Sequence, residues 1–345
     1  MGASSTIDRA PMRIVGFLNL FVLLLLTACA TRPPSFSTSL KGPALTPETF
    51  ITSDGWPLPL HQWQPGKQAE AVIVALHGFN DYGRFIEQPA HYFNKAGIAV
   101  YSYDQRGFGA SPGRGRWAGT KTYANDLATF VDLLRQRHPD TPLYVLGESM
   151  GGAVTAVAAV NGLPNVDGLI LAAPAVWARW TMPWYQRSLL WLGSHVAPWM
   201  KLTRKGLEIT PSDNIEMLRA LSQDPLVIKA TRIDAIAGLT NLMDSALASA
   251  PKLNTPTLLL YGEKDEIVPK EPTLAFIRQA KPNILKTAWY DEGYHMLLRD
   301  LQGERYWRDI LAWIRQPHGP LPSGADNHLP ELNSSKIMTM KEITE

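Results

Sequence analysis

The sequence predicts an α/β fold with a mostly parallel, doubly wound sheet and a helical cap inserted into it. Short apolar runs alternate with segments of helical spacing along most of the chain. The alternation stops at residue 175 and resumes near residue 255, with an aromatic-rich segment of helical character between them. One apolar run ends in Gly147-Glu148-Ser149-Met150-Gly151, a Gly-x-Ser-x-Gly pattern typical of a sharp turn from a buried strand into a helix.

Composition limits the class of protein. The chain has 345 residues, enough for one large α/β domain with an insertion. The net charge is +2 and no dense Lys/Arg patch occurs in the sequence, which argues against a nucleic-acid partner. Cys29 is the only cysteine, so no intramolecular disulfide forms.

The first 29 residues have the pattern of a targeting segment. Two arginines precede an apolar run that is too short for a membrane span of about 20 residues. The run ends in Leu26-Thr27-Ala28-Cys29, which resembles the lipobox of bacterial lipoproteins. This resemblance implies cleavage before Cys29, lipidation of its thiol, and, with Ala30 next, a place in the bacterial cell envelope at the outer membrane, facing the periplasm. An ordinary signal peptide or a short anchor helix is the alternative.

Continuous apolar runs predict buried parallel strands, and an Asp-Gly pair predicts a hairpin before them. The predicted parallel strands are residues 71–76, 99–104, 143–146, 168–172, 257–261 and 286–290. The predicted divisions are a signal peptide 1–29, a tether 30–46, a first core part 47–174, a cap 175–252, a second core part 253–316 and a disordered tail 317–345.

The cap is rich in tryptophan: Trp177, Trp180, Trp184, Trp191 and Trp199. Trp, Met and Leu alternate there with arginines, which suits a lid lying against lipid. The same residues also suit a lid whose rings form its own core, and the pattern leaves both interpretations open.

A serine hydroxyl needs a base held by an acid in order to act as a nucleophile. In a fold of this kind the order along the chain is serine, acid, histidine. We predict Ser149 as the nucleophile, Asp265 after the strand that follows the cap as the acid, and His295 after the last strand as the base. Glu263 is the alternative acid.

Two backbone N–H groups are needed to bind the oxyanion. We predict that Met150, the residue after the nucleophile, and Phe79, on the loop after the strand 71–76, supply them. The strand-to-helix turn that carries Ser149 is called the nucleophile elbow, and its glycines leave room where a side chain would collide with the strand or the helix. His77 is expected to hold the Phe79 loop by hydrogen bonds rather than act as a base.

These motifs resemble the α/β-hydrolases of the monoglyceride lipase, lysophospholipase and serine aminopeptidase group. The matching pieces are His77-Gly78, Gly83-Arg84-Phe85, Asp104-x-Arg106-Gly107-x-Gly109-x-Ser111, Gly147-Glu148-Ser149-Met150-Gly151-Gly152, Gly262-x-x-Asp265-x-x-Val268-Pro269 and Tyr294-His295. The resemblance implies a helical cap over an acyl pocket, no cofactor, and ester hydrolysis through an acyl-enzyme. Phe79 departs from the group's pattern where a small residue is common, and Gln105 where His is common.

The sequence therefore predicts a lipid-anchored serine hydrolase whose substrate is a lipid ester, monoacylglycerol or lysophospholipid. An acyltransferase uses the same acyl-enzyme and remains an alternative. A non-catalytic envelope lipoprotein that keeps the fold for binding is the alternative from another class. Ser149 argues against the related epoxide hydrolases and haloalkane dehalogenases, which carry aspartate at the elbow.

Overall fold

The computed structural model describes residues 42–203 and 208–328. The predicted signal peptide, Cys29 and residues 329–345 lie outside the described residues. Within those described ranges, none of the helices combines the length and the hydropathy that crossing a bilayer requires.

In the described part of the chain, nine strands form one sheet in the order β1-β2-β3-β5-β4-β6-β7-β10-β11. Neighbouring strands from β5 to β11 in this order are parallel, and the three strands at the other edge are antiparallel. The strands are β1 (Ala44–Leu45), β2 (Thr49–Ile51), β3 (Pro57–Trp63), β4 (Ala71–Leu76), β5 (Ile98–Tyr103), β6 (Leu143–Glu148), β7 (Gly168–Ala172), β10 (Thr257–Gly262) and β11 (Leu285–Tyr290). The predicted parallel strands are confirmed, with ends that differ by up to two residues.

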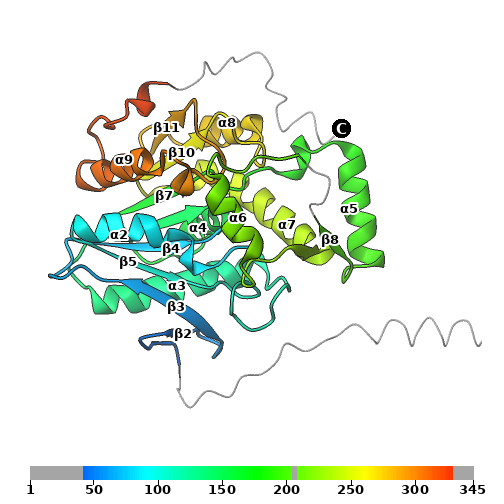
Figure 1. Ribbon diagram of the computed structural model, residues 1–345, viewed down its shortest axis with the longest axis horizontal. Coiled ribbons are helices and arrows are strands. Elements are labelled where there is room, and N and C mark those ends of the chain that lie inside the picture. The colour runs from blue at the N-terminus through cyan, green and yellow to red at the C-terminus, as the bar shows by residue number, and fades with distance from the viewer. Residues whose placement is uncertain (1–41, 204–207, 329–345) are drawn as a thin grey trace, which may run out of the picture. The chain divides into compact units, whose positions relative to one another are not determined.

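Helices cover both faces of the sheet (Figure 1). One face packs on α3 (Thr120–Arg137), α4 (Met150–Val160) and α8 (Lys270–Gln279), and the other on α2 (Glu87–Lys95) and α9 (Gly303–Arg315). The central strand β4 shows why its sequence is a continuous apolar run. Val72 and Val74 belong to the first core and Ile73 to the second, so both faces of the strand are buried.

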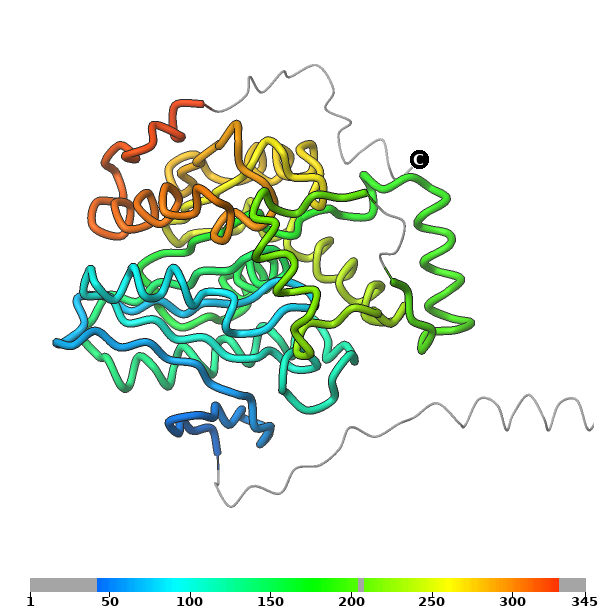
Figure 2. The backbone as a smooth tube through the Cα atoms, in the orientation of Figure 1, coloured from blue at the N-terminus to red at the C-terminus, as the bar shows by residue number. Residues whose placement is uncertain are grey.

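The cap lies between β7 and β10. It contains η2 (Arg179–Thr181), α5 (Trp184–Val196), α6 (Ile215–Gln223) and α7 (Ile233–Ser249). In Figure 2 the green trace of the cap leaves the sheet and returns to it through α7. α7 packs on α4 and α5 packs on α7. The cap is not helical throughout, because β8 (Lys201–Thr203) and β9 (Ala230–Arg232) form a short antiparallel pair.

Two predicted boundaries are wrong. The tether was predicted to extend to residue 46, but the backbone of β1 pairs with β2 and so belongs to the sheet. The tail was predicted to be disordered from residue 317, but Leu321 and Ala325 are buried against the core. Asp326 also forms an ion pair with Lys286 at 3.1 Å. A few apolar residues and one charge pair hold this polar stretch in place, which average composition does not reveal.

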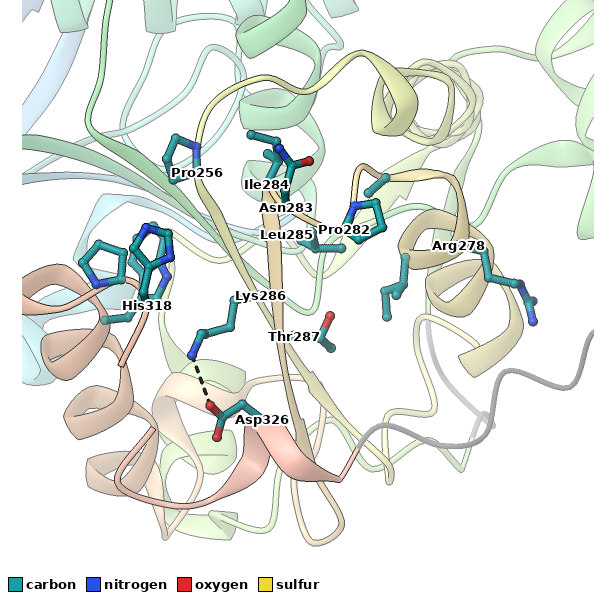
Figure 3. A pocket seen from close by; sticks show the side chains of 14 residues that line it. Pro256, Arg278, Pro282, Asn283, Ile284, Leu285, Lys286, Thr287, His318 and Asp326 are labelled. Carbon is teal, nitrogen blue, oxygen red and sulfur yellow. Dashed lines mark hydrogen bonds and ion pairs between the residues drawn. The ribbon is translucent and has the colours of Figure 1, made fainter. Parts of the chain in front are cut away.

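A cavity of about 670 Å³ lies beside the start of β11 (Figure 3). Pro256, Leu285, Lys286 and His318 contribute to its lining. The parallel strands begin at this edge of the sheet, whereas Ser149 follows the other end of β6. The cavity is therefore separate from the candidate active site.

Candidate active site

Ser149 occupies a strained turn between β6 and α4, with φ 53° and ψ −113°. A Cβ atom on Gly147 would lie 2.3 Å from the carbonyl carbon of Gly151. A Cβ atom on Gly151 would lie 2.2 Å from the carbonyl oxygen of Leu76. Both contacts involve backbone atoms, so the strand and helix approach each other only because these positions carry no side chain. The predicted steric need for the two glycines is borne out.

The structure brings Ser149, His295 and Asp265 together. His295 Nε2 lies 2.9 Å from Ser149 Oγ, and His295 Nδ1 lies 2.8 Å from Asp265 Oδ2. His295 and Asp265 are buried, whereas Ser149 is half-buried and accessible. The carboxylate fixes the imidazole with its proton on Nδ1, so that Nε2 faces the serine as a proton acceptor.

The electrostatics of His295 suit a base that must carry a positive charge during a reaction. Burial lowers the pKa of His295, but the charge and the hydrogen bond of Asp265 oppose it and leave the pKa above its ordinary value. The imidazolium form is therefore stabilised where proton transfer from Ser149 would create it.

Glu263, the alternative acid, does not lie against the histidine. Its carboxylate accepts a hydrogen bond from Trp289 Nε1 at 2.7 Å and forms an ion pair with Lys270. Its place near the end of β10 is explained by these contacts.

The two amides predicted to bind the oxyanion belong to segments that flank Ser149. Gly78 packs against the elbow, since a Cβ atom there would be 3.4 Å from Ser149 Cβ. The next amide belongs to Phe79, and Met150 N–H is at the first turn of α4. Within the described part of the chain, neither of these two N–H groups donates a hydrogen bond. Both donors are thus available beside Ser149, at the positive end of the α4 dipole.

His77 holds the loop that carries Phe79. His77 Nδ1 lies 2.8 Å from the carbonyl oxygen of Gly78, and His77 Nε2 accepts from the amide of Gln105 at 3.0 Å. Gln105 Nε2 donates back to the carbonyl oxygen of His77 at 3.0 Å. Burial lowers the pKa of His77, which keeps the ring neutral. The inferred structural role of His77 fits these contacts.

The Phe79 side chain packs against two other aromatic rings. Its ring centroid lies 5.5 Å from that of Phe108 and 6.3 Å from that of Trp117. Trp117 in turn packs on the cap, where a Cβ on Gly238 would lie 2.3 Å from its ring. Phe79 therefore links the loop that carries it, which we call the oxyanion loop, to the cap.

Two groups of residues near the site were not predicted from the sequence. Arg299 lies in a buried cluster with Glu148 and Asp81, at N–O distances of 2.7 Å to each. The cap also bonds directly to the Phe79 loop, because Tyr82 Oη donates to Asp224 at 2.8 Å and Asn80 Nδ2 donates to Thr231 at 2.7 Å. In the sequence Arg299 directly follows Leu297-Leu298, and a charged residue in such an apolar context could have indicated a buried position.

Among residues 42–203 and 208–328, no group of three His, Cys, Asp or Glu side chains is placed to hold a metal ion.

The family model described as serine aminopeptidase, S33 (Hydrolase_4) matches residues 67–302. The chain belongs to this family. The match covers every side chain described above as part of the site. It also includes the cap, so the insertion lies within the family's own segment.

Curated relatives are distant and cover most of the chain. Monoglyceride lipase of Mus musculus is 26% identical over 258 residues, which span 73% of this chain and 84% of the relative. Monoacylglycerol lipase of Mycolicibacterium smegmatis is 26% identical over 267 residues, which span 73% of this chain and 90% of the relative.

Solved structures confirm the predicted fold class, the α/β-hydrolase fold. A soluble variant of monoglyceride lipase from Saccharomyces cerevisiae superposes with a TM-score of 0.67 and 20% identity, over 82% of this chain and 98% of that one. Monoacylglycerol lipase of Paleococcus ferrophilus superposes with a TM-score of 0.63 and 22% identity, over 74% of this chain and 98% of that one.

Proposed function

We propose that this protein is a serine hydrolase that cleaves carboxylic esters of lipids, with monoacylglycerol or lysophospholipid as the substrate class. The observation that carries the proposal is the pair of hydrogen bonds that join Ser149, His295 and Asp265. The distant homology to monoglyceride lipases supports lipid esters as the substrate class.

In the proposed reaction Ser149 Oγ attacks the ester carbonyl and His295 Nε2 takes its proton. The N–H groups of Phe79 and Met150 stabilise the oxyanion, and Asp265 stabilises the imidazolium. His295 then donates the proton to the leaving alcohol, and an acyl-enzyme forms. Water, deprotonated by His295, attacks the acyl-enzyme and releases the fatty acid and the serine.

The exposed apolar side chains of the cap support the proposal of a lipid substrate. None of the residues of α5, all of them described, is buried, and Trp184, Leu189 and Trp191 are 76%, 66% and 64% exposed. We call the following set of exposed apolar side chains the cap face: Trp180, Trp184, Tyr185, Leu189, Trp191, Leu192, Val196, Trp199, Met200 and Leu202. Their exposure supports a lid that lies against lipid over a lid whose rings form its own core.

The charges around the cap face favour a bilayer as its partner. The sequence has no Asp or Glu between Asp167 and Glu208. Within this stretch, Arg187 and Lys201 are exposed. Aromatic rings with cations beside them suit the head-group region of anionic lipid. We propose that the cap face lies on the membrane to which lipidated Cys29 anchors the chain, at the outer membrane and facing the periplasm.

Two other functions give different results in simple assays. An acyltransferase would pass the acyl group to an added alcohol, so glycerol would appear acylated in the products. A non-catalytic lipoprotein would not react with a fluorophosphonate probe.

The decisive experiment treats the full chain with a fluorophosphonate probe and measures hydrolysis of p-nitrophenyl esters of rising chain length, then of monoacylglycerols and lysophospholipids. We expect labelling and turnover in the wild type and neither in a folded Ser149→Ala variant, with a loss in kcat of about 10⁴ to 10⁶. Wild-type turnover in Ser149→Ala would end the hydrolase assignment.

The cap face is tested with Trp184→Ser and Leu189→Ser. Because both side chains are exposed, the fold should tolerate the changes, while binding to anionic vesicles and kcat/KM for long esters in vesicles should drop by about tenfold. Hydrolysis of p-nitrophenyl acetate should not change. Leu301→Ser is the matched control. Leu301 is 72% exposed, and among the described residues it is the exposed large hydrophobic side chain that lies outside residues 180–215. Unchanged vesicle binding in both variants would refute the bilayer contact.

A further inference from the structure

Arg299 connects the three loops that make up the candidate active site. It ends the turn η4 (Leu297–Arg299), four residues after His295 on the histidine loop. Its Nη2 lies 2.7 Å from Glu148 Oε1 and 2.7 Å from Asp81 Oδ2. Glu148 directly precedes Ser149 on the elbow, and Asp81 lies two residues after Phe79 on the oxyanion loop. One side chain therefore contacts both the elbow and the oxyanion loop.

The cluster is shielded from water, so its ionic contacts matter. Arg299, Glu148 and Asp81 are 7%, 2% and 7% exposed. The guanidinium also lies 5.8 Å above the ring of Phe85. Removing one partner of a buried ion pair leaves the others charged without compensation. Without Arg299, the carboxylates of Glu148 and Asp81 would have no cation between them and would repel each other.

The contact between the two loops is close. A Cβ atom on Gly78 would meet Ser149 Cβ at 3.4 Å and Glu148 Oε1 at 3.9 Å. The amide of Phe79 follows directly, so its distance from the reacting carbon depends on how tightly the oxyanion loop lies on the elbow. The Asp81–Arg299–Glu148 bridge spans the same gap.

We propose that Arg299 is a positioning residue for the hydrolytic reaction, holding the oxyanion loop against the nucleophile elbow by bridging Asp81 and Glu148. The proposal rests on the proposed function, because it concerns the oxyanion donors of that reaction. Arg299 acts through Phe79 N–H rather than on the substrate. A donor that works mainly on the developing oxyanion affects kcat more than KM.

The test compares the full-length wild type with Arg299→Met on p-nitrophenyl butyrate. Prolonged labelling with a fluorophosphonate probe gives the number of reactive sites. The turnover rate is divided by that number, so unfolded protein does not lower the measured kcat. We expect kcat per labelled site to fall by roughly 10- to 100-fold, a part of the loss known for deleting an oxyanion donor, with KM changed less than about threefold. The rate of labelling should fall in parallel.

Arg305→Met is the matched control. It removes the same group from the same part of the chain, but Arg305 packs on the ring of Tyr290 and donates to the carbonyl oxygen of Ser323. Its kcat should equal that of the wild type. A loss equal to that of Arg299→Met would overturn the inference, because it would reflect a general effect of removing a guanidinium.

Two conservative variants keep the test decisive if Arg299→Met does not fold. Asp81→Asn and Glu148→Gln retain an acceptor for Arg299 and lose only charge, so both should fold and show several-fold lower kcat. Glu148→Gln has a second readout. Asp265 and Glu148 raise the pKa of His295 and Arg299 lowers it, so removing the Glu148 charge should move the acid limb of kcat/KM to lower pH.

The outcomes separate the two proposals. Wild-type kcat in folded Arg299→Met, or in Asp81→Asn when Arg299→Met does not fold, would overturn the positioning role and leave the hydrolase intact. A wild type that neither turns over esters nor reacts with the probe would overturn the proposed function, and the positioning role with it.

Discussion

Replacing Asp265 by Asn should remove most of the turnover and leave the fold intact. Asp265 Oδ1 accepts hydrogen bonds from the amides of Ile267 and Val268 at 2.8 and 2.9 Å, while Oδ2 faces His295 Nδ1 at 2.8 Å. Asparagine has one side-chain oxygen, and the amides of Ile267 and Val268 need that oxygen as their acceptor. Its NH₂ group then faces Nδ1, which must become an acceptor. The ring proton moves to Nε2, so His295 can no longer accept the proton of Ser149.

The magnitude follows from the tautomer. A triad histidine held in the wrong tautomer loses about 10⁴ in kcat. At about 1.36 kcal/mol for each factor of ten, this loss is roughly 5.4 kcal/mol of transition-state stabilisation. Initial rates on p-nitrophenyl butyrate measure it, and thermal unfolding checks that the variant is folded.

Glu263→Gln is the matched control, because its carboxylate contacts Trp289 and Lys270 rather than His295. Its kcat should stay close to that of the wild type. Turnover of folded Asp265→Asn within about tenfold of the wild type would refute the tautomer argument. A large loss in Glu263→Gln alone would transfer the role of the acid to Glu263.

Three further predictions concern protonation, packing and anchoring. Neutral His295 is the base, and its pKa lies above the ordinary value of a histidine, so kcat/KM should fall on acidification with a midpoint above that of a free imidazole. A profile that stays flat down to the ordinary histidine pKa contradicts this. Gly151→Ala places a methyl group 2.2 Å from the carbonyl oxygen of Leu76 and should lower the free energy of unfolding, measured by denaturant titration, by about 1–3 kcal/mol. Gly66→Ala, where a Cβ atom has nothing within 4 Å, should leave that free energy unchanged. Cys29→Ser should release the protein from the membrane fraction, and mass spectrometry that finds an unmodified Cys29 thiol in the native host would rule out the anchor.

The sheet was predictable because its pattern is local. A parallel strand buried on both faces must be apolar along its whole length, and the run 71–76 coincides with β4. The elbow was equally legible, since Gly147 and Gly151 are required by backbone contacts within one turn. The positions of Asp265 and His295 followed from chain order, because the carboxyl ends of parallel strands meet at one edge of the sheet.

Sequence alone thus determined the fold class, the place of the elbow and the candidates for its two partners. The tertiary structure shows that Asp265 rather than Glu263 lies against His295, that Trp184 is exposed on the cap, and that residues 317–328 pack on the core. It also joined Arg299 to Glu148, which is 151 residues away in the chain. The physical reason is the distance along the chain over which each effect acts. Periodicity and turn chemistry depend on a few neighbouring residues, whereas an ion pair or the exposure of a ring depends on which distant segment of the chain lies beside it.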